Sequence, residues 1–164
     1  MFSHLRIHTE FSIVDGTCRI DDLVQGAKND GQTALAITDV NNLFATVKFY
    51  TACRKAGIKP VIGCEIALKG LNDGMDLPKI ILLAKNQQGY LNLCRVLTLL
   101  WTQSADSSQA AVGWDAIESH REGLILLCGG LHGPIGQAIR SGNLQKAQEW
   151  AQTFSKAFQD HFYL

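Results

Sequence analysis

The sequence has no excess of either charge, only three prolines and no long uninterrupted apolar run. Its 15 basic and 15 acidic side chains cancel, so it lacks the positive surface by which a domain holds nucleic acid through its phosphates. No apolar stretch approaches the about 20 residues that cross a bilayer, and no charged segment followed by a long apolar one opens the chain. We therefore expect a soluble, cytoplasmic protein without a membrane partner.

The cysteines do not have the pattern of a disulfide-stabilised domain. There are five, an odd number, widely spaced and without a CxxC pair. Several stand in apolar runs such as the one that ends at Cys128. This pattern is typical of reduced core residues in a cytosolic protein. With 164 residues and 46% hydrophobic content, the chain can bury one core.

Segments with strand and helix patterns alternate along the chain. Period-2 or continuous apolar runs predict strands at 5–8, 34–38, 59–68, 79–84 and 123–128, with another beginning at 162. Helical spacing and end signals predict helices at 20–29, 43–56, 90–101, 135–140 and 144–158. Polar stretches at 70–76 and 103–109 are expected to be loops.

This alternation predicts an α/β protein with a parallel sheet covered by helices, either open and doubly wound or closed as a barrel. A barrel of this kind usually needs more residues than the 164 present, and the last predicted strand has only begun. We therefore expect the chain to be part of a larger domain.

Polar residues follow several of the predicted strands. His8, Asp15, Asp39 and Glu65 stand at or just after strand ends, and Gly129-Gly130 follows the strand that ends at Cys128. Carboxylates and imidazole that converge from strand ends are how metal-assisted hydrolases are built. A structural role is the alternative for His8, and Asp39 could instead cap the helix that starts near residue 43. Glu65, inside an apolar strand, needs a cationic or hydrogen-bonding partner.

Several blocks resemble one known family. They are residues 4–12 (HLRIHTEFS) with Asp15-Gly16, 36–39 (AITD) with Asn42-Leu43, 57–65 (GIKPVIGCE), 83–86 (LAKN) with Gly89-Tyr90 and Asn92-Leu93, and 123–130. In order and spacing they are similar to the PHP (polymerase and histidinol phosphatase) domain at the N-terminus of bacterial DNA polymerase III alpha subunits, of the metal-site-depleted, proteobacterial-like type. The resemblance covers essentially the whole chain.

The resemblance implies a fold and a site. The fold would be a PHP-type distorted (β/α)7 TIM-like barrel, with residues 1–164 forming roughly its first two thirds and the polymerase palm, fingers and thumb absent. Metal-binding members hold ions with His, Asp, Glu and Cys from the strand ends. Matched position by position, the remnant site is His8, Asp15, Asp39 and Glu65. The family ligands are replaced at Arg6, Val40, Lys79 and Gly130.

Two of these replacements are cationic, which leads to our hypothesis for the site. Arg6 or Lys79 would repel a divalent ion and could pair with Asp15 and Glu65, so we expect no metal in this segment and Arg6 as the counter-charge in its place.

By resemblance, the segment is a catalytically inactive structural element and docking site for the proofreading exonuclease (epsilon) subunit. The full-length protein would be a Mg2+-dependent DNA-directed DNA polymerase that contacts DNA and other holoenzyme subunits through its remaining domains. The alternative is an active metal-dependent phosphoesterase or 3′–5′ exonuclease that uses the four remnant residues. A third possibility is a protein-interaction module unrelated to replication.

Overall fold

The computed structural model describes residues 2–13, 15–69, 77–104 and 110–164. The chain forms two compact units, residues 1–64 and 65–164. The expected loop at 70–76 and most of the loop at 103–109 lie outside the described residues. Among the helices that are described, none is long and apolar enough to span a membrane.

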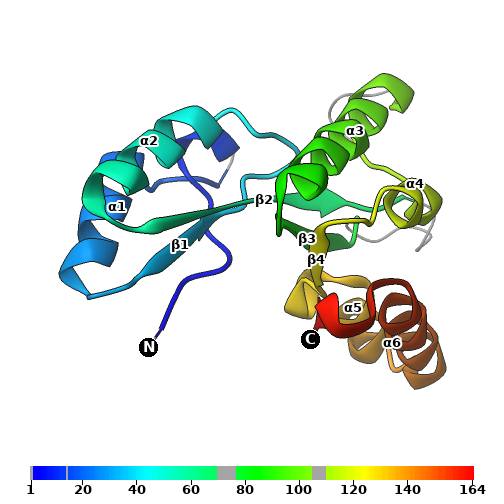
Figure 1. Ribbon diagram of the computed structural model, residues 1–164. Helices are drawn as coiled ribbons and strands as arrows, with labels where there is room; N and C mark the ends of the chain where they lie inside the picture. The colour runs from blue at the N-terminus through cyan, green and yellow to red at the C-terminus, as the bar shows by residue number, and fades with distance from the viewer. Residues whose placement is uncertain (1, 14, 70–76, 105–109) are drawn as a thin grey trace. The chain divides into compact units, whose positions relative to one another are not determined.

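The first unit packs two helices beside a pair of parallel strands (Figure 1). Its elements are η1 (Glu10–Ser12), α1 (Ile20–Asn29), β1 (Ala34–Ile37), α2 (Thr46–Ala56) and the start of β2 (Lys59–Ala67). In the β1–β2 pair, Ala34 lies opposite Lys59 and Ile37 opposite Ile62. The helix and strand side chains that face inward form one buried apolar cluster: Ile20, Val24, Ala27, Leu35, Ile37, Ala45, Phe49, Cys53 and Ile58.

Residues 4–7 run beside β1 but do not form the strand predicted at residues 5–8. His4 O accepts from Ala36 N at 3.0 Å and Ile7 O accepts from Thr38 N at 2.8 Å, so this segment lies along β1. Ile7 N, however, donates to the Thr38 side-chain oxygen at 3.0 Å instead of to a main-chain carbonyl. The side chain takes the place of a ladder bond, and a regular strand does not form.

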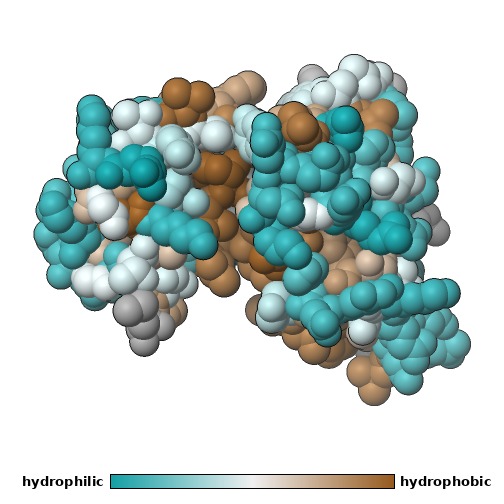
Figure 2. Space-filling view, viewed as in Figure 1, coloured by the Kyte–Doolittle hydropathy of each residue, from teal (hydrophilic) through white to brown (hydrophobic). Residues whose placement is uncertain are grey.

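Helix α2 begins later than predicted and buries a different face. Asn42 Oδ1 accepts from Phe44 N at 3.1 Å, which holds a turn before the helix and delays its start to Thr46. Val47 and Tyr50 are among the apolar residues whose helical spacing predicts this helix, yet they are 77% and 50% exposed. Apolar residues are visible on the surface of the first unit near α2 in Figure 2. The buried stripe of α2 instead runs through Phe49 and Cys53.

The strand order of the second unit is the end of β2, then β3 (Lys79–Ala84), β4 (Leu124–Leu127) and β5 (Phe162–Tyr163). Strands β4 and β5 are parallel, but β3 and β4 are antiparallel, with Ile81 opposite Leu127 and Ala84 opposite Leu124. The expectation of an all-parallel sheet is therefore wrong at this pair. Lys85 N donates to Gly123 O at 2.9 Å, so the chain enters β4 at the end of the sheet where β3 leaves it.

Helices α3 (Gln87–Gln103), α4 (Trp114–Ser119), α5 (Pro134–Arg140) and α6 (Leu144–Phe158) complete the second unit, with short turns η3 (Gly130–His132) and η4 (Gln159–His161). The exposed side of α6 is largely hydrophilic (Figure 2). Its buried side forms an aromatic cluster in which the rings of Trp114 and Phe154 are 4.8 Å apart. Helix α4, which contributes Trp114, was not predicted because six residues give too short a pattern to recognise.

Candidate functional site: the strand-end carboxylates

Asp39, just after β1, is a buried carboxylate with three hydrogen-bond donors. Its Oδ1 accepts from Thr9 N at 2.6 Å and from Ser12 Oγ at 2.7 Å, and its Oδ2 accepts from Thr9 Oγ1 at 2.8 Å. Only 2% of the residue is exposed. The cap hypothesis is wrong, because these donors belong to the loop around η1 and not to the first turn of α2. Asp39 ties that loop to the end of β1.

His8 and Asp15 pair with each other inside the same unit. His8 Nδ1 lies 2.9 Å from Asp15 Oδ2, and the side chains are 10% and 48% exposed. The loop that carries them closes tightly. A Cβ at Gly16 would lie 1.7 Å from Thr9 O, so only glycine allows this approach. The His8 nitrogen that faces Asp15 is therefore already occupied.

Glu10, a residue for which the sequence predicts no role, joins this loop to both helices. Its carboxylate accepts from Ile20 N at 3.1 Å, which caps the start of α1, and from Lys48 Nζ of α2 at 3.1 Å. Desolvation raises the pKa of Glu10, but the hydrogen bond and charge of Lys48 and the main-chain donors outweigh it. The pKa lies below the ordinary value of 4.5. The sequence gives no signal for this cap. Glu10 lies ten positions before the helix and reaches its first turn only because the loop folds back onto it.

In the second unit, the expected partner of the buried carboxylate is present. Lys79 Nζ, at the start of β3, lies 3.8 Å from Glu65 Oε1, and the two side chains are 35% and 3% exposed. The attraction is strengthened by the low polarity around Glu65. A lysine ammonium thus stands where a cation is needed to balance this carboxylate.

The remaining replaced positions offer no metal donor of their own. Arg6 is exposed and cationic, and Val40 carries an aliphatic side chain. Gly130 has no side chain and a positive φ of 56°, a backbone conformation that favours glycine over other residues. Across the residues that the structure describes, no group of three or more His, Cys, Asp or Glu side chains could hold a metal ion.

The profile of the PHP domain matches residues 4–164. The chain belongs to the PHP domain family. Among curated relatives, it is 39% identical over 163 residues to the DNA polymerase III subunit alpha of Vibrio cholerae and 36% identical over 163 residues to that of Pseudomonas aeruginosa. Each match covers 99% of this chain and 14% of the relative. The α/β fold class inferred from the resemblance is thereby confirmed for this PHP domain.

Among solved structures, the PHP domain is similar to an amidohydrolase from Chromobacterium violaceum, with 15% sequence identity and a TM-score of 0.44. The likeness covers 92% of this chain and 54% of that one.

The residues of this PHP domain do not fit the metal cluster that the family implies. The Asp39 oxygens are held by Thr9 and Ser12, and Lys79 brings a positive charge to Glu65. Borderline metals need about four nitrogen, oxygen or sulfur donors, and an ammonium group beside Glu65 repels a divalent ion. This donor set therefore does not support a catalytic step through a metal.

Proposed function

We propose that this chain is the N-terminal PHP domain of a bacterial DNA polymerase III alpha subunit and that it serves the polymerase as a catalytically inactive structural element. The full-length protein would be a DNA-directed DNA polymerase that uses Mg2+ in its other domains. The similarity to two alpha subunits along 99% of the chain supports this context.

The observation that carries the inactive assignment is the engagement of Asp39. A carboxylate has about four lone-pair positions, and three of those of Asp39 accept hydrogen bonds from buried donors at 2.6–2.8 Å, so at most one position is left for an ion. Breaking those bonds would leave Thr9 and Ser12 donors unsatisfied in the interior, which is costly. The geometry supports a structural carboxylate.

We further propose that cationic side chains supply the charge that a metal supplies in active family members. Lys79 has this role beside Glu65, at 3.8 Å. Arg6, the other cationic side chain at a position where the resemblance implies a ligand, is the proposed counter-charge for the first block, residues 4–12 with Asp15.

Metal analysis and a hydrolysis assay test this inactive role. The purified chain, dialysed against manganese or zinc and then against buffer, is expected to retain no stoichiometric metal. It is also expected to hydrolyse neither nitrophenyl phosphate nor a single-stranded 3′ end with added manganese. Glu65→Ala and the exposed control Glu118→Ala should give the same background rate. Activity that Glu65→Ala removes and Glu118→Ala retains would establish the alternative, an active phosphoesterase or exonuclease.

The proposed partner, the proofreading exonuclease (epsilon) subunit, follows from the resemblance to polymerases with depleted PHP sites. Pull-down of the purified exonuclease subunit by the tagged chain is the direct test. The tagged chain is expected to retain more of the exonuclease subunit than an unrelated tagged domain does. Failure to bind at micromolar concentrations would contradict the docking role while leaving the inactive-site assignment to the metal and hydrolysis measurements.

A further inference from the structure

A basic pocket lies in the second unit, at the end of β3 opposite to Lys79. The two ends of this six-residue strand are about 17 Å apart, so the pocket is separate from the Glu65–Lys79 pair. Its volume of about 590 Å³ is within the range of small-ligand sites, roughly 300–1,000 Å³. The lining residues that matter here are Lys85 after β3, Arg121 before β4, Lys156 and Phe158 of α6, and His161 of η4.

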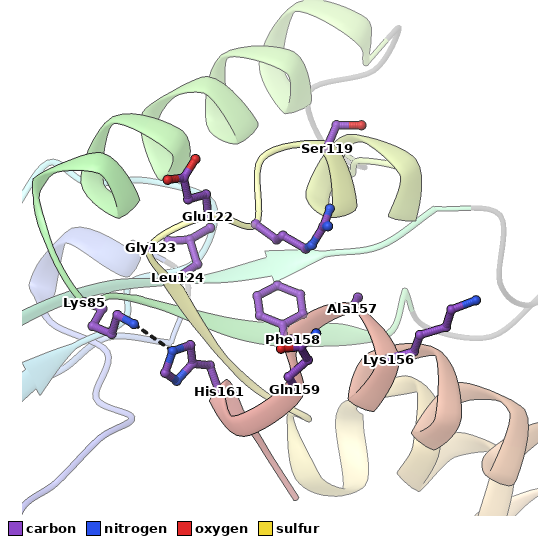
Figure 3. A pocket seen from close by; sticks show the side chains of 11 residues that line it. Lys85, Ser119, Glu122, Gly123, Leu124, Lys156, Ala157, Phe158, Gln159 and His161 are labelled. Carbon is purple, nitrogen blue, oxygen red and sulfur yellow. Dashed lines mark hydrogen bonds between the residues drawn. The ribbon is translucent and has the colours of Figure 1, made fainter.

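Lys85 is held at the wall of the pocket by a contact that leaves its charge uncompensated. Its Nζ lies 2.7 Å from His161 Nε2 (Figure 3). An ammonium group can only donate, so Nε2 is the acceptor and carries no proton in this arrangement. The main chain is fixed as well, because Lys85 N donates to Gly123 O at 2.9 Å. His161 therefore positions Lys85 without neutralising it.

The pocket carries a net positive charge. Lys85, Arg121 and Lys156 contribute three positive charges and Glu122 one negative charge, which leaves two positive charges with His161 uncharged. None of the ion pairs found among the described residues includes one of these three cations. In Figure 3, Lys85 and Lys156 lie on opposite sides of the Phe158 ring, and both the Glu122 carboxylate and the Lys156 ammonium point away from that ring.

A strained residue accompanies this arrangement. Gln159 has φ 49° and ψ −122°, a conformation that glycine adopts far more readily than glutamine. The turn at Gln159 ends α6 and leads into η4, which carries His161. Strain of this kind persists where the surrounding structure requires it, frequently at a binding site.

We propose that this pocket binds phosphate groups, in a ligand that carries at least two negative charges there. Cations without carboxylate partners complement phosphate oxygens, and the lysine and arginine donors can bond them directly. The phosphates of a small molecule, such as a nucleotide or pyrophosphate, and those of a nucleic-acid backbone share this chemistry. The inference is independent of metal content and of exonuclease docking.

Isothermal titration calorimetry on the purified chain tests the proposal, in EDTA to remove divalent ions. The probes are sodium pyrophosphate, dTTP and a short oligothymidylate, each titrated at low and at high sodium chloride. Lys85→Gln keeps a donor for His161 and removes the charge, and Lys156→Gln removes a second charge. Lys59→Gln, on the exposed first residue of β2, is the matched control. Circular dichroism establishes that each variant is folded.

At least one probe is expected to bind, and the dissociation constant is expected to rise about tenfold in Lys85→Gln and further in the double variant with Lys156→Gln. Lys59→Gln should bind like the parent chain. Binding of pyrophosphate or dTTP would identify a small phosphate ligand as the source, and binding of the oligothymidylate alone would identify the nucleic-acid backbone. The proposal would be overturned if none of the three probes bound. It would also be overturned if Lys59→Gln weakened binding as much as Lys85→Gln does.

Discussion

Thr9 and Asp39, 30 residues apart in sequence, are joined by two hydrogen bonds that use both carboxylate oxygens. Thr9 N donates over 2.6 Å and Thr9 Oγ1 over 2.8 Å, and Thr9 is itself fully buried. Asp39 thus fastens the first loop to the end of β1.

Replacement of Asp39 by alanine is expected to lower the free energy of unfolding by about 3 kcal/mol, because Thr9 and Ser12 would keep buried donors without an acceptor. Asp39→Asn retains one acceptor oxygen and is expected to lose less. Urea denaturation followed by circular dichroism gives both values. Asp22→Ala, at an exposed position in the first turn of α1, is the control, with an expected loss below about 1 kcal/mol. Equal effects of Asp39→Ala and Asp22→Ala would show that the Asp39 bonds are not stabilising.

The parts of the fold that were predicted from sequence are those whose local pattern and tertiary contacts agree. Helix α1 has the predicted bounds because Ile20, Val24 and Ala27 recur at helical spacing and face the core. In α2, Val47 and Tyr50 have the same spacing but are exposed, while Phe49 and Cys53 are buried. Two apolar stripes on one helix cannot be ranked from sequence, because burial is decided by the neighbouring strands.

The candidate site was predictable in its residue types but not in its bonding. The need for a cation near Glu65 follows from burial of a carboxylate, and Lys79 meets it. The role of Asp39 depends on Thr9 and Ser12, whose hydroxyls reach it only because the loop folds back at Gly16. Nothing in the spacing of these residues distinguishes such a bond from a helix cap or a metal ligand.

Glu10 is expected to make the stability of the chain depend on pH at its acidic end. Its pKa in the folded state lies below 4.5, so the stabilisation is fully present above about pH 4.5 and is lost as the pH falls through the folded-state pKa. Glu10→Gln should therefore lower the free energy of unfolding at pH 7 by about 0.5–1 kcal/mol. The difference from the parent chain should shrink toward pH 3.

Urea titrations at a series of pH values measure this difference, with Glu118→Gln at an exposed site of α4 as the control. Lys48→Met should reproduce part of the effect, because it removes the ion pair but leaves the bond from Ile20 N. A Glu10→Gln difference that stays constant from pH 7 to pH 3 would contradict the assigned role.

Two glycines in helices are expected to respond to alanine with opposite signs. A Cβ at Gly89, near the start of α3, would lie 1.9 Å from Gly123 O, whereas a Cβ at Gly26, within α1, would meet no atom within 4 Å. Gly89→Ala must push the main chain of the β4 entry away, with an expected loss of about 3 kcal/mol. Gly26→Ala should raise the free energy of unfolding by about 0.5–1 kcal/mol, since alanine favours the helical backbone. Thermal and urea denaturation of both variants measure the signs, and a stable Gly89→Ala protein would disprove the close approach.

The cysteines are expected to react with alkylating agents in an order set by burial. Cys18 is exposed, whereas Cys53 lies in the core of the first unit and its burial raises its pKa to about 11. The thiolate is the reactive form of cysteine, and at pH 8 only about one Cys53 thiol in a thousand is ionised. Burial in the core also keeps the reagent away from this thiol. Iodoacetamide should therefore modify Cys18 in the native chain and reach Cys53 only as the unit unfolds. Peptide mass spectrometry over a time course, with and without urea, gives the two rates, and Cys18→Ser identifies the fast phase.

Since opening of the first unit is required for Cys53 to react, Asp39→Ala should accelerate its modification in parallel with the loss of stability. A Cys53 rate as fast as that of Cys18 in the native chain would mean that the α2 face of the core is open to solvent.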